Sequence, residues 1–130
     1  MRVMALDAAL NHTGYVIHDG SRITEVGVIK VKGSLSTQEK LLEIGARIAR
    51  LIFRRAVDRV VLEGCYNARN AKTAHQLSMV HGAIMLTAAN CGVDVTTIPP
   101  ATIRKRVAGS GKATKEQVAQ AVVGYYANDL

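Results

Sequence analysis

The sequence has no tryptophan, one phenylalanine and only two cysteines. With so few large aromatic side chains, a hydrophobic core must be built mainly from aliphatic residues. Hydrophobic residues make up 48% of the 130 residues and charged residues 21%, which is typical of one folded globular domain. Cys65 and Cys91 form no CxxC pair, which argues against a disulfide framework or a zinc cluster and favours a reducing cytoplasm.

Long apolar runs are also absent. No stretch of about 18 apolar residues occurs, so no segment is expected to span a membrane. Near the N-terminus, Asp7 interrupts the apolar run too early for a signal peptide. No internal repeat, low-complexity tract or linker divides the chain. We therefore expect a single cytoplasmic domain over residues 1–130.

Negative charge is scarce relative to positive charge. Lys and Arg outnumber Asp and Glu by 17 to 10, which gives a formal net charge of +7 and an isoelectric point near 9.8. Such an excess in a small domain indicates a polyanionic partner, most often nucleic acid. The alternative is a protein that is simply basic, and the charge alone does not separate the two.

Hydrophobic patterning and turn signals predict five strands and four helices. The strands are expected over residues 2–7, Gly14–His18, Ile23–Val31, Asp58–Glu63 and Val93–Ile98. The helices are expected from a Ser36–Glu39 capping box to about Arg55, over Asn70–Asn90, over Thr102–Val107, and from a Thr114 cap with Gln117 to about Tyr126. This order predicts an α/β domain with a mixed sheet and helices on both of its faces.

Two acidic residues end predicted strands. Asp7 ends the first strand and Glu63 ends the fourth. Ligands of α/β sheets gather outside the carboxyl ends of the strands, so these two carboxylates could share a divalent metal such as Mg²⁺. The alternative is that each acid satisfies nearby backbone amides or a basic neighbour. His12 could reach the same site, although a loop histidine without a metal is the commoner case.

Three segments resemble the motifs of RuvC-type Holliday junction resolvases. In residues 6–15, Asp7 is followed by a Thr-Gly-Tyr triplet. In residues 62–71, Glu63 precedes the aromatic Tyr66 by three positions, and Arg69-Asn70-Ala71 opens the next helix. Residues 109–118 resemble the family's loop and helix that carry a DNA-contacting lysine. Together the three matches span nearly the whole chain in the family's order.

The resemblance implies a ribonuclease H-like fold, with a three-strand meander followed by two parallel strands. It also implies a homodimeric endonuclease that cuts four-way or other branched DNA with Mg²⁺, for which Mn²⁺ could substitute. Asp7 and Glu63 would be catalytic metal ligands, and Lys115 would be a third catalytic residue. The residues that would contact DNA are Tyr66, which would stack on bases, and Arg69, Asn70, Arg104, Lys105, Lys112 and Lys115, which would bind the backbone, with Arg106 nearby.

The sequence departs from the family pattern at two places. Ala8-Ala9 stands where the family usually has a Pro-Gly pair. The family also carries two further acids one helical turn apart on a C-terminal helix, and the sequence ends at Leu130, before that helix should begin. Asp129 falls several residues too early to be one of them. With two ligands in place of four, we expect weak Mg²⁺ binding.

Two alternatives remain at this stage. One is a non-catalytic protein of the same fold that binds branched DNA, and metal-dependent cleavage would separate it from the nuclease. The other is a fragment of an actin-like ATPase, which would bind ATP. The segment Gly109-Ser110-Gly111-Lys112 is not a phosphate-binding P-loop, because that motif requires Gly at Arg106 and Ser or Thr at Ala113.

Overall fold

The computed structural model of the chain describes residues 1–64 and 70–129, and within these ranges strands and helices follow in the predicted order. The strands are β1 (Val3–Asp7), β2 (His12–His18), β3 (Ile23–Lys30), β4 (Arg59–Glu63) and β5 (Asp94–Ile98). The helices are α1 (Thr37–Arg55), α2 (Ala71–Asn90), α3 (Pro100–Ala108) and α4 (Lys115–Tyr125). Among the described residues, no helix is both long enough and apolar enough to cross a bilayer.

The strands form one mixed sheet in the order β3-β2-β1-β4-β5. The β1–β2 and β2–β3 pairs are antiparallel, whereas β1–β4 and β4–β5 are parallel. This is the predicted three-strand meander followed by two parallel strands. We call the edge at which β1, β4 and β5 finish the carboxyl end of the sheet, and the edge at which they begin the amino end.

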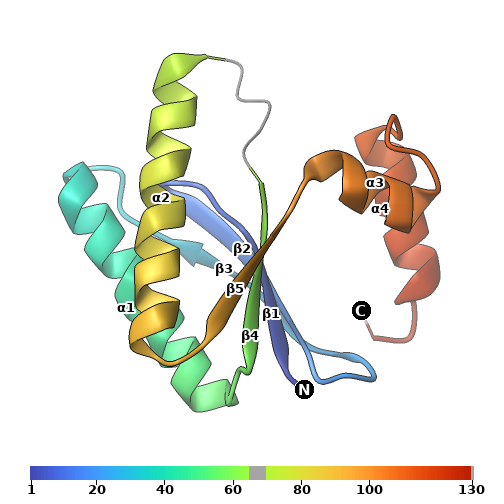
Figure 1. Cartoon of the computed structure of the whole chain (residues 1–130), viewed down its shortest axis with the longest axis horizontal. Coiled ribbons are helices and arrows are strands. Elements are labelled where there is room, and N and C mark those ends of the chain that lie inside the picture. Colours follow the sequence, from blue (N-terminus) through green and yellow to red (C-terminus); the bar gives the residue numbers. More distant parts are fainter. Residues whose placement is uncertain (65–69, 130) are drawn as a thin grey trace.

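One face of the sheet, which we call the inner face, is covered by α1 and α2 (Figure 1). Alternate strand residues point inward, and Met4 and Leu6 of β1 are buried together with Val60 and Leu62 of β4. The helices contribute a second apolar layer to the same core. Its buried members are Ile44, Ile48 and Ile52 of α1 and Val80, Ile84 and Ala88 of α2.

The two covering helices approach each other closely at Gly45. A Cβ atom at this position would lie 2.9 Å from the Thr87 hydroxyl oxygen of α2. Glycine therefore permits the contact that keeps α1 and α2 side by side over the sheet.

The opposite face, which we call the outer face, carries the intervening strand residues. Ala5 and Asp7 of β1 are exposed on it, as is Glu63 of β4. Helices α3 and α4 lie on this side of the sheet, and α4 returns toward the amino end (Figure 1). There Tyr126 packs edge-on against His18, with ring centroids 6.1 Å apart. The prediction of helices on both faces is therefore confirmed.

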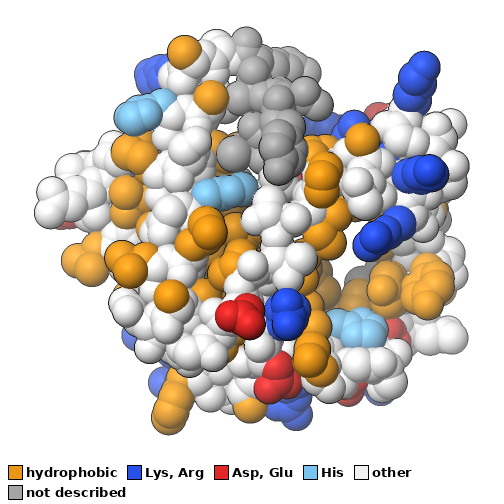
Figure 2. Space-filling model, in the orientation of Figure 1, with side chains coloured by type: hydrophobic (Ala, Val, Ile, Leu, Met, Phe, Trp, Pro, Cys, Tyr) orange, Lys and Arg blue, Asp and Glu red, His pale blue; other side chains and the backbone are white. Residues whose placement is uncertain are grey.

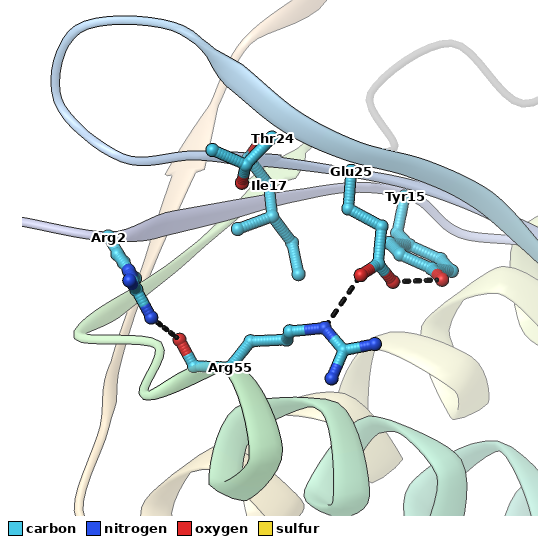
Figure 3. Close-up of polar contacts among 6 residues, drawn as sticks. All are labelled: Arg2, Tyr15, Ile17, Thr24, Glu25 and Arg55. Carbon is cyan, nitrogen blue, oxygen red and sulfur yellow. Dashed lines mark hydrogen bonds and ion pairs between the residues drawn. The ribbon is translucent and has the colours of Figure 1, made fainter.

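A polar cluster ties the end of α1 to the meander (Figure 3). The Tyr15 hydroxyl donates to Glu25 Oε2 at 2.7 Å, and Arg55 Nε donates to Glu25 Oε1 at 2.6 Å. These two hydrogen bonds lower the pKa of the Glu25 carboxyl, and the bond to Glu25 raises the pKa of Tyr15. Gly27 makes room for the Tyr15 ring, because a Cβ there would lie 2.6 Å from ring atoms.

Helix starts follow their local signals, whereas some boundaries differ from the prediction. Both predicted capping boxes, at Ser36 and at Thr114, are present. Strand β2 begins at His12, two residues earlier than expected, because it continues to pair with β3 there. Helix α3 begins at Pro100, because a proline is well suited to the first turn, where its missing N–H is not needed.

Candidate active site at the carboxyl end of the sheet

Asp7 and Glu63 come to the same place in the fold. The parallel register pairs Leu6 with Leu62, so the next residue on each strand is an acid at the carboxyl end. Adjacent strands lie about 4.8 Å apart, and both side chains are exposed on the outer face. Within residues 1–64 and 70–129, neither carboxylate takes part in an ion pair. The arrangement places two carboxylates side by side and accessible to a ligand.

The neighbouring strand leaves the flank of Asp7 open. Gly14 of β2 is the register partner of Asp7, and a Cβ at Gly14 would lie 3.8 Å from the Asp7 Cβ. That distance is an ordinary contact, but any longer side chain would extend beside the Asp7 carboxylate. Glycine therefore keeps this side of the acid pair free.

The connection between β1 and β2 is held from two sides. The fully buried Thr13 donates its hydroxyl to the Ala9 carbonyl at 2.9 Å and accepts from the Ala9 N–H at 3.4 Å. On the other side, Lys40 of α1 donates from Nζ to Asn11 Oδ1 at 2.7 Å. The Asn11 carbonyl also accepts from the Val31 N–H at 3.0 Å. These contacts fix the backbone that leaves Asp7.

Lys40 is a residue that the sequence reasoning missed. Its side chain is 9% exposed, so an ammonium group is placed at the edge of the core close to the loop after Asp7. The sequence does contain a signal for the burial of Lys40. It precedes Ile44, Ile48 and Ile52 at a spacing of four, which places it on the buried stripe of α1. A lysine in such a stripe indicates a specific polar partner inside the fold.

Asn70 has a structural contact at the start of α2. It is the N-cap of the helix, and its Oδ1 accepts from the Thr73 N–H at 2.8 Å. Its side-chain amide nitrogen makes no hydrogen bond within the described residues, and the residue is exposed. Tyr66 and Arg69, the other residues predicted to contact DNA in this segment, lie outside the described residues.

The predicted DNA-contacting cations of residues 100–115 gather on α3, the loop after it and the start of α4. We call this set the α3–α4 cation cluster, and no acidic residue interrupts it. Blue side chains over these helices are visible at the right of Figure 2. The exposed members of the cluster are Lys105, Arg106, Lys112 and Lys115, and the partly exposed member is Arg104.

Arg104 differs from the other members of the cluster. Its Nε donates to the Gly111 carbonyl at 2.9 Å, which ties α3 to the loop that leads into α4. Gly111 in turn lies close to α3, since a Cβ there would be 3.6 Å from the Ala101 carbonyl. One N–H of the guanidinium thus braces the loop, and the terminal nitrogens make no hydrogen bond with residues 1–64 or 70–129.

Asp129 is far from the acid pair. Its Oδ2 accepts from the Ile23 N–H at 3.0 Å, at the amino end of the sheet. Within residues 1–64 and 70–129, no group of three or more His, Cys, Asp or Glu residues is arranged to hold a metal ion. The described residues therefore offer two carboxylates, a donor set that fits a hard divalent cation that keeps several of its waters.

Comparison with known proteins gives one consistent family. The family model for crossover junction endodeoxyribonuclease RuvC matches residues 3–126. A protein of that name from Sorangium cellulosum is 33% identical over 124 residues, covering 92% of this chain and 69% of its own length. The corresponding protein from Koribacter versatilis is 34% identical, covering 98% of this chain and 80% of its own length.

Solved structures agree with these sequence matches. Thermus thermophilus RuvC in complex with a Holliday junction substrate superimposes with a TM-score of 0.88 at 26% identity. The match covers 98% of this chain and 80% of that chain. The yeast mitochondrial Holliday junction resolvase Ydc2 has a TM-score of 0.69 at 11% identity, which shows a shared fold.

Proposed function

The chain belongs to the RuvC family of crossover junction endodeoxyribonucleases, and we infer that it is a structure-selective endonuclease that cuts Holliday junctions. The single observation that supports this best is the position of Asp7 and Glu63. They lie side by side at the carboxyl end of the sheet, on the face that also carries the α3–α4 cation cluster. A carboxylate pair next to a basic surface suits the hydrolysis of a phosphodiester.

We propose that the acid pair holds Mg²⁺, for which Mn²⁺ can substitute. Carboxylate oxygens are preferred ligands of both ions. When bound, the metal would polarise the phosphate and lower the pKa of an attacking water. Asp7 and Glu63 would orient the ion, and the contacts of Thr13 and Lys40 would keep the backbone after Asp7 in place. Two carboxylates alone would bind the ion weakly.

The basic residues would place the DNA against this pair. Lys115, at the first position of α4, would sit beside the scissile phosphate and stabilise its charge. Lys105 and Lys112 would bind flanking phosphates, and Arg104 would do so with its terminal nitrogens while Nε braces the loop. The side-chain amide of Asn70 would add a donor, Arg69 a further cation, and Tyr66 would stack on an unpaired base at the crossover.

We further propose that the protein acts as a homodimer, because symmetric cutting of two strands needs two active sites. Helix α2 offers a surface for such contact, with Met85 51% and Leu86 64% exposed. The cellular setting would be the cytoplasm of a bacterium or of a phage-infected host. Light scattering of the purified protein should give twice the mass of one chain, and a monomer at micromolar concentration would contradict the dimer.

The test of the function compares a four-way junction with a linear duplex of the same sequence. We expect tighter binding to the junction at physiological salt, with an affinity that falls steeply as salt rises. Cleavage should require added Mg²⁺ or Mn²⁺ and cease with EDTA. Equal affinity for the two DNAs would contradict the resolvase assignment. Junction binding without cutting in either metal would instead favour the non-catalytic DNA-binding alternative.

A further inference from the structure

A second group of basic residues lies at the carboxyl end of the sheet, on the two strands beyond the acids. His12 of β2 and Lys30 of β3 are direct register partners. Both are exposed, whereas their neighbours Thr13 and Ile29 are buried on the inner face. Strand side chains alternate between faces, so His12 and Lys30 stand together on the outer face.

The same pattern continues one step past β3. Val31 is buried and pairs through its N–H with the Asn11 carbonyl, and Lys32 after it is exposed. If the alternation of β3 is continued, Lys32 falls on the outer-face side. We call His12, Lys30 and Lys32 the β2–β3 cation surface. No ion pair involving these residues occurs within residues 1–64 and 70–129, so the charges of Lys30 and Lys32 are not neutralised by that part of the protein.

The order of the strands sets this surface on one side of the acids. From one edge to the other, the strands carry Lys30, His12, Asp7 and Glu63, and β5 then leads into α3. The acids are therefore flanked by the β2–β3 cation surface and by the α3–α4 cation cluster. Two strand spacings put the backbone of β3 about 10 Å from that of β1. One strand of a DNA duplex carries one phosphate per roughly 3.4 Å of helix axis, so about 10 Å corresponds to about two or three nucleotides.

We propose that the β2–β3 cation surface binds the DNA backbone on the side of the scissile phosphate opposite the α3–α4 cation cluster. Lys30 and Lys32 would neutralise phosphates two or three nucleotides from the cut, and the His12 imidazole would add a hydrogen bond. A strand held on both sides of the acid pair is fixed in register over it, which a single basic cluster cannot achieve. This proposal rests on the proposed function, because it assumes that Asp7 and Glu63 mark the cut.

The charges of this surface can be removed without loss of a hydrogen bond that holds the backbone. Arg47 of α1 donates from Nη1 to the backbone carbonyl of Lys30 at 2.9 Å, so the position of Lys30 is held through its main chain. Lys30→Gln combined with Lys32→Gln removes two charges and leaves this hydrogen bond in place. The matched control is Arg50→Gln combined with Arg54→Gln, two exposed residues of α1, the helix that covers the inner face.

The measurement is junction affinity in EDTA over a range of salt. For the Lys30/Lys32 variant, the slope of log affinity against log salt should become shallower by about 2, one for each phosphate that the variant leaves unneutralised. Between 50 and 200 mM salt the affinity should then fall by roughly tenfold less than for the wild-type protein. The Arg50/Arg54 control should keep the wild-type slope. Equal slopes for the two variants would overturn the proposal.

A second measurement locates the binding position on the DNA. Single phosphates of the junction are replaced by neutral methylphosphonates, one position at a time. The wild-type protein should bind more weakly when a phosphate two or three nucleotides from the cut is neutral, and the Lys30/Lys32 variant should be insensitive to that change. If the wild-type protein fails to prefer the junction, the proposed function itself fails. If it prefers the junction but both proteins respond alike at every phosphate, only the second surface is wrong.

Discussion

The hydrogen bonding of the carboxylates differs between the two ends of the sheet. Toward the amino end, Glu25 accepts from Tyr15 and Arg55, Asp58 accepts from the Arg2 N–H at 2.7 Å, and Asp129 accepts from the Ile23 N–H. At the carboxyl end, Asp7 and Glu63 are exposed, adjacent and without an ion pair among the described residues.

Acids that stabilise a fold are surrounded by donors from that fold. Acids that bind a ligand must keep their oxygens accessible to it, and nearby like charges are tolerated where a cation will intervene. Asp94 at the amino end is exposed as well, so the feature that marks Asp7 and Glu63 as candidate catalytic acids is that they are both exposed and adjacent.

The largest effect should come from neutralising an acid at the carboxyl end. We expect Asp7→Asn to lower Mg²⁺-dependent junction cleavage at least about 100-fold, since a catalytic metal supplies several kcal/mol. Junction binding should remain. The matched control is Asp94→Asn, the same chemical change at an exposed position that begins β5 at the amino end. Gel-based cleavage kinetics measure both, and comparable decreases in the two variants would remove the distinction between the ends.

A smaller effect is expected at the residue that holds the loop after Asp7. Lys40→Met removes the ammonium that bonds Asn11 and keeps most of the apolar packing of the side chain. The Mg²⁺ concentration for half-maximal cleavage should rise, by up to about tenfold, because supporting contacts tune a metal site. Lys40→Arg should keep the Mg²⁺ concentration for half-maximal cleavage close to that of the wild-type protein. A decrease in thermal stability without any change in the Mg²⁺ dependence would make Lys40 a purely structural residue.

For the Tyr15–Glu25 cluster, the test concerns folding and not cleavage. Gly27→Ala would force a Cβ to within 2.6 Å of the Tyr15 ring, and overpacking of this kind costs about 1–3 kcal/mol of unfolding free energy. Gly82→Ala in α2, where a Cβ meets nothing within 4 Å, should stabilise by about 0.5–1 kcal/mol. Urea unfolding measures both changes, and a neutral Gly27→Ala would mean that Tyr15 does not pack as described.

The smallest expected effect is a decrease in the free energy of unfolding at low pH. The pKa of Glu25 is lowered by its bonds to Tyr15 and Arg55, and that of Asp19 is lowered to about 2 by the N–H groups of its turn. A lowered folded pKa adds stability that is present above the unfolded value, 4.5 for Glu25, and is lost as pH falls through the folded value. Unfolding free energy should therefore decline below about pH 4.5. Glu25→Gln should flatten part of that decline, and an unchanged profile would argue against the Glu25 cluster.

The strand ends, two of the helix starts and the two acids of the candidate site could be predicted from the sequence, because they depend on local patterns. Short apolar runs predicted that Asp7 and Glu63 end strands, and the capping boxes at Ser36 and Thr114 located two helix starts. The family resemblance then supplied the fold, a three-strand meander followed by two parallel strands. That the two acids share a face follows once β1 and β4 pair in parallel with Leu6 opposite Leu62.

What the sequence could not predict depends on contacts between distant segments. The extension of β2 to His12 requires its pairing with Lys30, and the partner of Lys40 is 29 residues away in the chain. Arg55 at the end of α1 binds Glu25, 30 residues away. Arg104 was predicted to contact DNA, and the sequence did not predict that it also bonds the Gly111 carbonyl. No local pattern specifies such partners.

The proposed active site requires that Asp7 and Glu63 share one divalent cation. The most direct measurement is anomalous scattering from crystals soaked in Mn²⁺, which marks the ion independently of activity. We expect a peak between the two side chains, with an oxygen of each carboxylate at about 2.1–2.2 Å. A peak elsewhere, or carboxylates more than about 8 Å apart with the ion bound to neither, would contradict it.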